Sequence, residues 1–239
     1  MAHDLIKLKN YLKLISKKIS YLVLDKIKNK IRKKNFYWQF RHILNPKIWE
    51  IYYDNSNVKR RDFYSKYVHQ NNLRTLFEFG CASGPNLSNL TKNVSWDIYY
   101  FGYDISKTAI RFANQKLKKD NYFFTNKLNK RILKMQLNIW QKKFFDLSIY
   151  DRVLYLLSEK EIRKHFLEYK DYQSKVIIDD FHNSKFQDKN EEYYSKDYEM
   201  ILLTFGFKLI KNQPSEHIIG TDDFFKRSSR RLIFEKLSE

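Results

Sequence analysis

The sequence has a single cysteine, Cys81, and no long apolar run. One thiol cannot form an internal disulfide, and it cannot supply the paired cysteines of a structural zinc site. No stretch approaches the roughly 20 apolar residues that cross a bilayer, and the N-terminus lacks the uninterrupted apolar core of a secretory signal. We therefore expect a protein that stays in the reducing cytoplasm.

Acidic residues are scarce relative to basic ones, since 27 Asp and Glu stand against 46 Lys and Arg, for a net charge of +19. Such an excess favours a polyanionic partner. Most of it lies in the first 70 residues. The chain is also rich in Lys, Asn, Ile, Tyr and Phe, which a genome of low G+C content favours, so this bias is an alternative explanation for the excess downstream.

The composition and apolar spacing of residues 1–70 predict a basic, helical N-terminal segment. Basic residues crowd the stretch from Lys26 to Lys34, and an aromatic stretch from Tyr37 to Tyr53 could cover one mouth of the following domain. Residues 1–34 therefore predict a basic amphipathic helix, which could lie on an anionic membrane surface, bind a partner or pack against the domain. Its apolar residues recur at spacings of three and four, on one helix face: Leu5, Leu8, Leu12, Ile15, Ile19 and Leu22.

Residues 71–239 alternate short apolar runs with amphipathic stretches. One expected helix covers 106–117, with Ser106 as its N-cap, and another covers 159–170, opened by a capping box from Ser158 to Glu161. Strands separated by helices predict an α/β fold with a doubly wound, mostly parallel seven-stranded sheet, preceded by the N-terminal helices. The expected strands are 75–79, 98–103, 122–125, 145–150, 176–178, 207–210 and 231–235.

Two of only five glycines, Gly80 and Gly84, stand close together directly after the first expected strand. A strand that runs through glycine-rich backbone into a helix lets a ligand approach the main chain and the free N–H groups of the helix start. Asp104 ends the next strand, near the spacing of roughly 20 residues that a ribose-binding carboxylate keeps from such a loop. The pattern predicts a ligand with an anionic or polar end and a ribose.

Three motifs together resemble those of class I S-adenosylmethionine-dependent methyltransferases. The resemblance covers about residues 73–236. It implies a Rossmann-like sheet of seven strands whose last strand, 231–235, runs antiparallel between the fifth and the sixth, and it implies S-adenosylmethionine as the cofactor. The motifs are Phe77-Glu-Phe-Gly-Cys-Ala-Ser-Gly84, Gly102-Tyr-Asp-Ile-Ser106 and Phe145-Asp-Leu-Ser-Ile-Tyr-Asp-Arg-Val-Leu-Tyr-Leu157.

The resemblance also implies roles for residues. The loop Gly80–Gly84, which includes Cys81, would pass under the methionine part of the cofactor, and Glu78 would support that end. Asp104 would hold the ribose, and Ile105 would pack on the adenine.

The sequence departs from the family pattern in two places. Ala82 stands where the family often has glycine. Where many members carry an acid after the third strand, for the adenine amino group, this chain offers Asn126, Asn129 or Asn138, of which we take Asn126 because its carbonyl could accept the same hydrogen bond. A nicotinamide-dependent dehydrogenase is disfavoured, because the last glycine falls one position early for G-x-G-x-x-G and an acid precedes the loop by two.

Methyl transfer displaces a sulfonium, so the protein mainly positions the acceptor and removes its proton. In the family the acceptor approaches over the carboxyl ends of strands four and five, where this chain has Tyr150 and Asp151, and His182 as a candidate general base. Asp151 with Asp179 and Asp180 also resembles the carboxylate cluster of metal-dependent catechol-type O-methyltransferases, which would suit magnesium. We prefer a site without a metal.

We interpret the chain as a methyltransferase that acts on a small molecule or a cell-surface glycan intermediate, in the cytoplasm or at the inner face of the membrane through residues 1–34. One alternative is an RNA methyltransferase with a basic phosphate-binding face, although the Asn/Asp-Pro-Pro-aromatic signature of amino-methylating enzymes is absent. Another is a non-catalytic binding protein with this fold, against which the intact glycine loop and Asp104 argue.

Overall fold

The computed structural model describes residues 47–54, 59–182, 196–215 and 229–237. The chain divides into two units, residues 1–38 and 39–239, and every described residue belongs to the second. The predicted amphipathic helix of residues 1–34 lies outside the described residues. Within the described ranges, no helix is long and apolar enough to cross a membrane.

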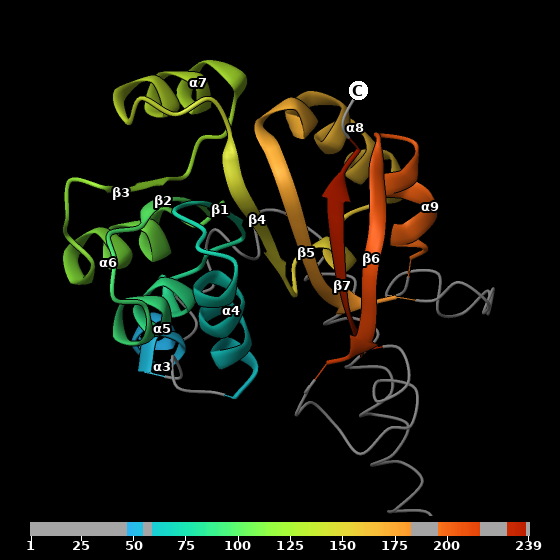
Figure 1. Ribbon diagram of the computed structural model, residues 1–239. Helices are drawn as coiled ribbons and strands as arrows, with labels where there is room; N and C mark the ends of the chain where they lie inside the picture. Colours follow the sequence, from blue (N-terminus) through green and yellow to red (C-terminus); the bar gives the residue numbers. More distant parts are fainter. Residues whose placement is uncertain (1–46, 55–58, 183–195, 216–228, 238–239) are drawn as a thin grey trace, which may run out of the picture. The chain divides into compact units, whose positions relative to one another are not determined.

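Helices and strands alternate along most of the described chain (Figure 1). The helices are α3 (Ile48–Asp54), α4 (Lys59–Gln70), α5 (Pro85–Asn93), α6 (Lys107–Lys116), α7 (Lys130–Ile139), α8 (Glu159–Tyr169) and α9 (Tyr198–Leu203), with short 3₁₀ turns at Leu154–Leu156 and Lys170–Tyr172. The strands are β1 (Thr75–Phe79), β2 (Tyr99–Tyr103), β3 (Tyr122–Thr125), β4 (Phe145–Asp151), β5 (Gln173–Phe181), β6 (Phe207–Pro214) and β7 (Ser229–Lys236).

The strands form one seven-stranded sheet in the order β3-β2-β1-β4-β5-β7-β6. All pairs from β3 to β5 are parallel, whereas β7 is antiparallel to both β5 and β6. The predicted seven strands and the antiparallel insertion of the last one are therefore confirmed. Strands β5, β6 and β7 extend beyond their predicted bounds, because their polar ends pair through the backbone although the apolar runs stop earlier.

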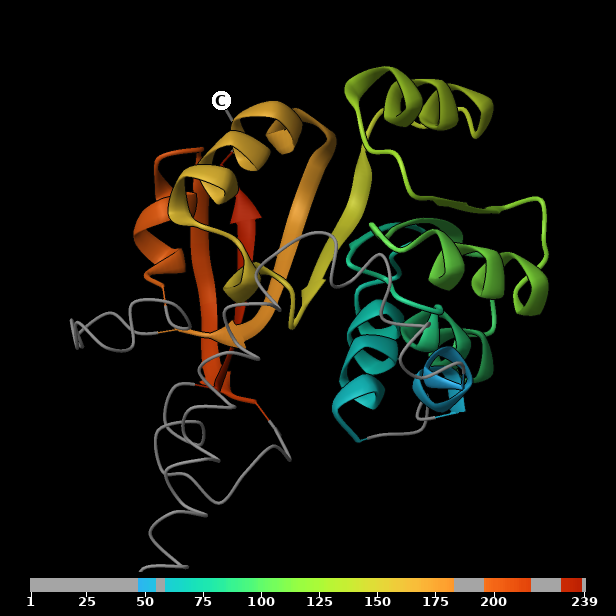
Figure 2. The ribbon, with the colours of Figure 1, turned by 180° about the vertical axis from the view of Figure 1, so that it is seen from behind.

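Hydrophobic cores cover both faces of the sheet, because successive side chains of a strand point to opposite sides. Phe77 of β1 belongs to a core with residues of α7, α8 and α9. Its neighbour Leu76 belongs to a core with residues of α4, α5 and α6. Figures 1 and 2 show the two sets of helices from opposite directions. Helix α4 thus belongs to the core of the sheet, with Tyr64 and Val68 fully buried.

Local signals place the helix starts as predicted. The Ser106 hydroxyl accepts from the backbone N–H of Ala109 at the start of α6. Ser158 and Glu161 form a reciprocal capping box at the start of α8. Since β1, β2, β4 and β5 are parallel, their carboxyl ends meet at one edge of the sheet, and most of the predicted site residues follow them there.

Candidate functional site

The loop after β1 turns sharply through left-handed backbone. Gly80 and Gly84 have φ of 80° and 82°, and Ala82 between them has φ of 48°. The N–H groups of Gly80 and Cys81 both donate to Tyr103 O of β2, at 2.7 and 2.9 Å. These bonds fix the loop across the ends of two neighbouring strands, which is the position that the sequence predicted.

Gly80 and Gly84 are favoured by close packing as well as by their positive φ angles, because a side chain at either position would clash with a neighbour. A Cβ on Gly80 would lie 2.7 Å from Cγ2 of Val153, which follows β4, and a Cβ on Gly84 would lie 2.6 Å from Leu117 Cδ1. The segment after β4 therefore touches the glycine loop. Cys81 is buried in the core beneath, so its thiol does not line the loop surface.

Asp104 joins the glycine loop to the start of α6. Its Oδ2 accepts from Ala82 N at 2.9 Å, and its Oδ1 accepts from Ser106 N at 2.8 Å. Burial raises the pKa of Asp104 to about 6, against these two hydrogen bonds, which lower it. Each carboxylate oxygen has a second lone pair, so Asp104 can accept from two further donors such as a pair of hydroxyls.

Glu78 lies behind the loop, inside the protein. Its carboxylate accepts from the Tyr100 hydroxyl through a short hydrogen bond, and from Asn86 Nδ2 at 2.8 Å. Burial raises the pKa of Glu78 to about 8, although both hydrogen bonds lower it. With an exposed fraction of 2%, Glu78 supports the loop and the start of α5 from beneath.

Asp151, at the end of β4, shares the same amide. Its Oδ2 accepts from Asn86 Nδ2 at 3.1 Å and from an Arg60 guanidinium nitrogen at 3.2 Å. Burial would raise the pKa of Asp151, but the charges of Arg60 and Arg61 outweigh it and hold the pKa below its ordinary value. Arg61 Nε in turn donates to Asn86 Oδ1 at 2.9 Å.

Asn86 therefore bridges Glu78 and Asp151, which we call the acidic pair. Arg60 and Arg61 of α4 offset the negative charge of this acidic pair. Asp151 Oδ1 is buried and, within the described residues, has no hydrogen-bond partner. A buried acceptor of this kind at a strand end is suited to meeting a donor group of a ligand.

The two carboxylates near the end of β5, Asp179 and Asp180, are engaged by protein groups. Asp179 is fully buried and bound to Arg231 at 2.8 Å and to Arg152 at 3.3 Å. Asp180 accepts from the backbone N–H groups of Phe181 and Tyr155. No group of three His, Cys, Asp or Glu in the described part of the chain is placed to hold a metal ion. These arginine partners argue against the magnesium alternative.

His182 follows β5 and lies 6% exposed. Its Nδ1 is 3.1 Å from Lys196 O, and because a carbonyl only accepts, Nδ1 carries the proton and Nε2 is the basic nitrogen. Burial lowers the pKa of His182 from its ordinary value. The ring is therefore neutral at neutral pH, as a general base must be.

Tyr150 lies in the core beneath the sheet, away from this group. Its hydroxyl accepts from Gln173 Nε2 and lies 2.8 Å from His165 Nε2, and no part of the residue is exposed. Burial lowers the pKa of His165 to about 3, so this histidine is neutral. These partners argue against the predicted catalytic role of Tyr150, whose position on β4 points its side chain to the face covered by α8.

Two predicted adenine contacts lie at the same edge of the sheet. Ile105 and Asn126 follow β2 and β3 and are half-buried. Asn129 instead caps α7, where its Oδ1 accepts from Ile132 N, and Asn138 is exposed on that helix. Among the three candidates, the structure leaves Asn126 uncommitted to a helix.

Helix α3 covers the glycine loop, as the aromatic stretch suggested for this part of the chain. Trp49 Nε1 donates to Thr108 Oγ1 at 2.9 Å. Its ring packs with Ala109 of α6 and with Ala82 of the loop. Helix α3, within the predicted N-terminal segment, thus contacts the glycine loop and the start of α6.

Sequence reasoning missed Arg60, Arg61 and Asn86. The only signals were a pair of arginines that opens a helix, and a polar residue in the first turn after the glycine loop. Neither signal shows that these side chains meet, because α4 and α5 are separate elements. Their contacts make α4 part of the site.

The family of the chain follows from comparison with known proteins. A family model described as a methyltransferase domain matches residues 69–221. A comparison with curated proteins gave no match.

Solved structures of low sequence identity share the fold. The plantazolicin methyltransferase BpumL, in complex with a monoazolic desmethylPZN analog and SAH, has a TM-score of 0.57 and 16% identity, over 91% of this chain and 100% of that one. The magnesium protoporphyrin IX methyltransferase ChlM from Synechocystis PCC 6803, with bound SAH, has a TM-score of 0.53 and 14% identity, over 89% and 100%. The mitomycin 7-O-methyltransferase MmcR has a TM-score of 0.58 and 10% identity, over 84% and 60%. With the family match over most of its length, and with the seven-stranded sheet and glycine loop described above, the chain belongs to the methyltransferase-domain family.

Proposed function

We propose that the protein transfers the methyl group of S-adenosylmethionine to a small-molecule acceptor. The observation that carries this proposal is the pairing of the left-handed loop Gly80–Gly84 with the half-buried carboxylate of Asp104, at the joined ends of β1 and β2. Such a loop accepts a ligand against its backbone, and the carboxylate suits two ribose hydroxyls. BpumL and ChlM, which share the fold, were solved with SAH.

The cofactor would lie along the carboxyl edge of the sheet. Its methionine part would lie on the glycine loop, where the acidic pair lies beneath and beside the backbone. Its ribose would bind Asp104, and its adenine would pack on Ile105 near Asn126. The charge of S-adenosylmethionine includes a sulfonium, so the negative Asp151 at the end of β4 favours the donor over its neutral product.

The acceptor would enter over β4 and β5. In the proposed mechanism, Nε2 of the neutral His182 takes the acceptor proton as the methyl group moves. Asp151 stays ionised because its pKa is lowered, so it orients a donor group of the acceptor or cofactor rather than removing a proton. The names of BpumL, ChlM and MmcR give plantazolicin, magnesium protoporphyrin IX and mitomycin, and these acceptors favour a small molecule here. A glycan intermediate belongs to the same proposal.

The experiment is a transfer assay with methyl-labelled donor over panels of small molecules, glycan intermediates and RNA. We expect labelled small-molecule or glycan product, and label in RNA alone would favour the RNA alternative. His182→Gln should lower turnover while SAH affinity stays unchanged, because the imidazole contacts the acceptor and not the cofactor. Equal turnover with His182→Gln would remove the histidine from the mechanism. Donor binding without any transfer, across all panels, would support the non-catalytic alternative.

A further inference from the structure

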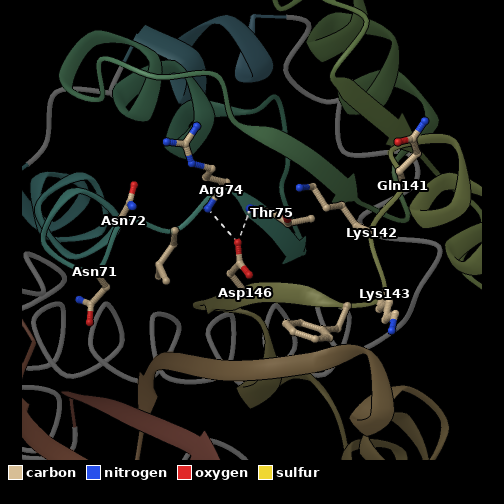
Figure 3. A pocket seen from close by; sticks show the side chains of 10 residues that line it. Asn71, Asn72, Arg74, Thr75, Gln141, Lys142, Lys143 and Asp146 are labelled. Carbon is tan, nitrogen blue, oxygen red and sulfur yellow. Dashed lines mark hydrogen bonds between the residues drawn. The ribbon is translucent and has the colours of Figure 1, made fainter.

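A cavity of about 480 Å³, whose lining residues Figure 3 shows, lies at the amino ends of β1 and β4, opposite the carboxyl ends that carry the methyl-transfer site. Its walls are the turn between α4 and β1 and the turn between α7 and β4, so it opens at the amino ends of the strands. Its volume falls within the range of about 300 to 1,000 Å³ that is usual for small-ligand sites. Nothing in the proposed methyl transfer uses this edge.

Cations dominate the charged groups of the cavity. Arg74, Lys142 and Lys143 line it, against one acid, Asp146. The Arg74 guanidinium lies 5.7 Å from the ring centre of Trp96, and Lys142 Nζ lies 5.5 Å from that of Tyr99. Each of these two cations thus has an aromatic partner, although neither Trp96 nor Tyr99 lines the cavity itself.

Asp146 lies in the middle of the lining side chains in the close view (Figure 3). Its Oδ2 accepts from the backbone N–H groups of Arg74 and Thr75, at 2.9 and 2.8 Å. Both of these hydrogen bonds end on Oδ2 and not on Oδ1. The acid thus has an acceptor left for a neutral donor such as a sugar hydroxyl, while two backbone groups already balance part of its charge.

Amides and an aromatic ring complete the lining. Asn72 and Gln141 both have left-handed backbone, with φ of 50° and 56°, and each stands at the tip of one of the two turns. Phe144 lines the same cavity and is 46% exposed. Amides pair with the hydrogen-bonding edges of bases, and exposed aromatic rings stack on base faces.

We propose that this cavity binds a nucleotide, with its phosphate on Lys142 and Lys143, a ribose hydroxyl on Asp146 and its base on Phe144. Each chemical part of a nucleotide has a matching group in the lining, whereas inorganic phosphate would use only the lysines. The nucleotide is either free or part of an RNA, since both present the same groups. The site is independent of the cofactor site, because the two lie at opposite ends of the strands.

The test is calorimetric titration of the full chain with CMP and UMP, their nucleosides and inorganic phosphate, at low salt. Saturating SAH is present so that the cofactor site is occupied. We expect at least one nucleotide to bind, and to bind tighter by about tenfold or more than its nucleoside or inorganic phosphate, because charged hydrogen bonds and stacking both contribute. No binding by either nucleotide, or equal binding by inorganic phosphate, overturns the proposal.

Variants assign the binding to the cavity. Lys142→Ala with Lys143→Ala should weaken nucleotide binding about tenfold. The control, Lys130→Ala with Lys134→Ala, removes the same charge from exposed positions on α7 and should leave nucleotide binding unchanged. If both double variants lose equal affinity, the loss reflects net charge alone and the assignment to the cavity is overturned.

Two further measurements separate the ligand source and the two sites. A short single-stranded RNA that displaces the nucleotide identifies RNA as its source, and one that fails to do so identifies the free nucleotide. Asp104→Asn should leave nucleotide binding unchanged, so a failure of the cofactor proposal remains distinguishable from a failure of this one. Unchanged thermal transitions would show that the variants are folded.

Discussion

The substitution Asp104→Asn separates charge from shape at the proposed ribose position. The wild-type carboxylate accepts from Ala82 N and Ser106 N at 2.9 and 2.8 Å, and it would also accept from the ribose. An asparagine keeps one acceptor oxygen but presents an NH₂ group where the second stood. Since hydrogen bonds to a charged group contribute about 1.5 to 3 kcal/mol each, we expect SAH affinity to fall by roughly tenfold to a hundredfold.

The same residue predicts a pH dependence of binding. Burial raises the pKa of Asp104 to about 6 in the free protein. Ribose hydroxyls donate to the ionised form, so binding lowers this pKa and requires the carboxyl to lose its proton. Affinity should therefore fall as the pH drops below about 6, approaching tenfold per pH unit, and should level off above it. Asn does not titrate, so this dependence should be missing from the variant.

The assay is calorimetric titration with SAH between about pH 5 and pH 8, with proton release measured in buffers of different ionisation enthalpy. Asp120→Asn, at an exposed position, is the matched control for loss of one negative charge. Glu78, whose pKa burial raises to about 8, titrates near the upper end of this pH range in both proteins. Any effect of Glu78 on SAH affinity should therefore be the same in the wild type and in Asp104→Asn. If the SAH affinity of Asp104→Asn still falls below about pH 6, or if its affinity at neutral pH equals that of the wild type, the proposed role of Asp104 is refuted.

Three other perturbations test the remaining parts of the account. Gly80→Ala should lower the free energy of unfolding, measured by urea denaturation, by about 1 to 2 kcal/mol from left-handed backbone strain alone. The steric clash of the new Cβ with Val153 should lower it further. Adding Val153→Ala should restore the part of the stability lost to the clash but not the part lost to strain. Asn86→Asp should destabilise the fold by about 3 kcal/mol, because it adds a third carboxylate to the buried acidic pair; a change under about 1 kcal/mol would contradict the bridging role. Deletion of residues 1–34 should leave SAH affinity unchanged but reduce sedimentation with anionic vesicles at low salt, since each basic residue near such a surface contributes about 1 kcal/mol; equal sedimentation rules out attachment, and collapse of the thermal transition shows that the segment packs on the domain.

Local signals in the sequence were sufficient for the sheet and its loop. Apolar runs of strand length mark β1 to β7, and the serines at 106 and 158 mark helix starts because capping acts within one turn. Gly80 and Gly84 are recognisable because scarce glycines concentrate where φ must be positive. Asp104 follows from the spacing between the ends of neighbouring parallel strands. Each of these inferences depends on residues that are close in sequence or fixed by sheet geometry.

The polar contacts across elements could not be predicted in the same way. Arg61 meets Asn86, and Arg231 meets Asp179, only because helices and strands far apart in sequence pack together. In a hydropathy pattern such residues resemble solvent-exposed positions. Tyr150 shows the converse case, since its place near a strand end suggested the site, whereas its buried hydroxyl accepts from Gln173 in the core.

The most direct test of the central claim is a crystal structure of the full chain with SAH. The account predicts SAH at the carboxyl edge of the sheet, with its amino-acid part on the loop Gly80–Gly84 and both ribose hydroxyls within hydrogen-bond distance of the Asp104 carboxylate. SAH bound at another edge of the sheet, or a ribose whose hydroxyls do not reach Asp104, would contradict it.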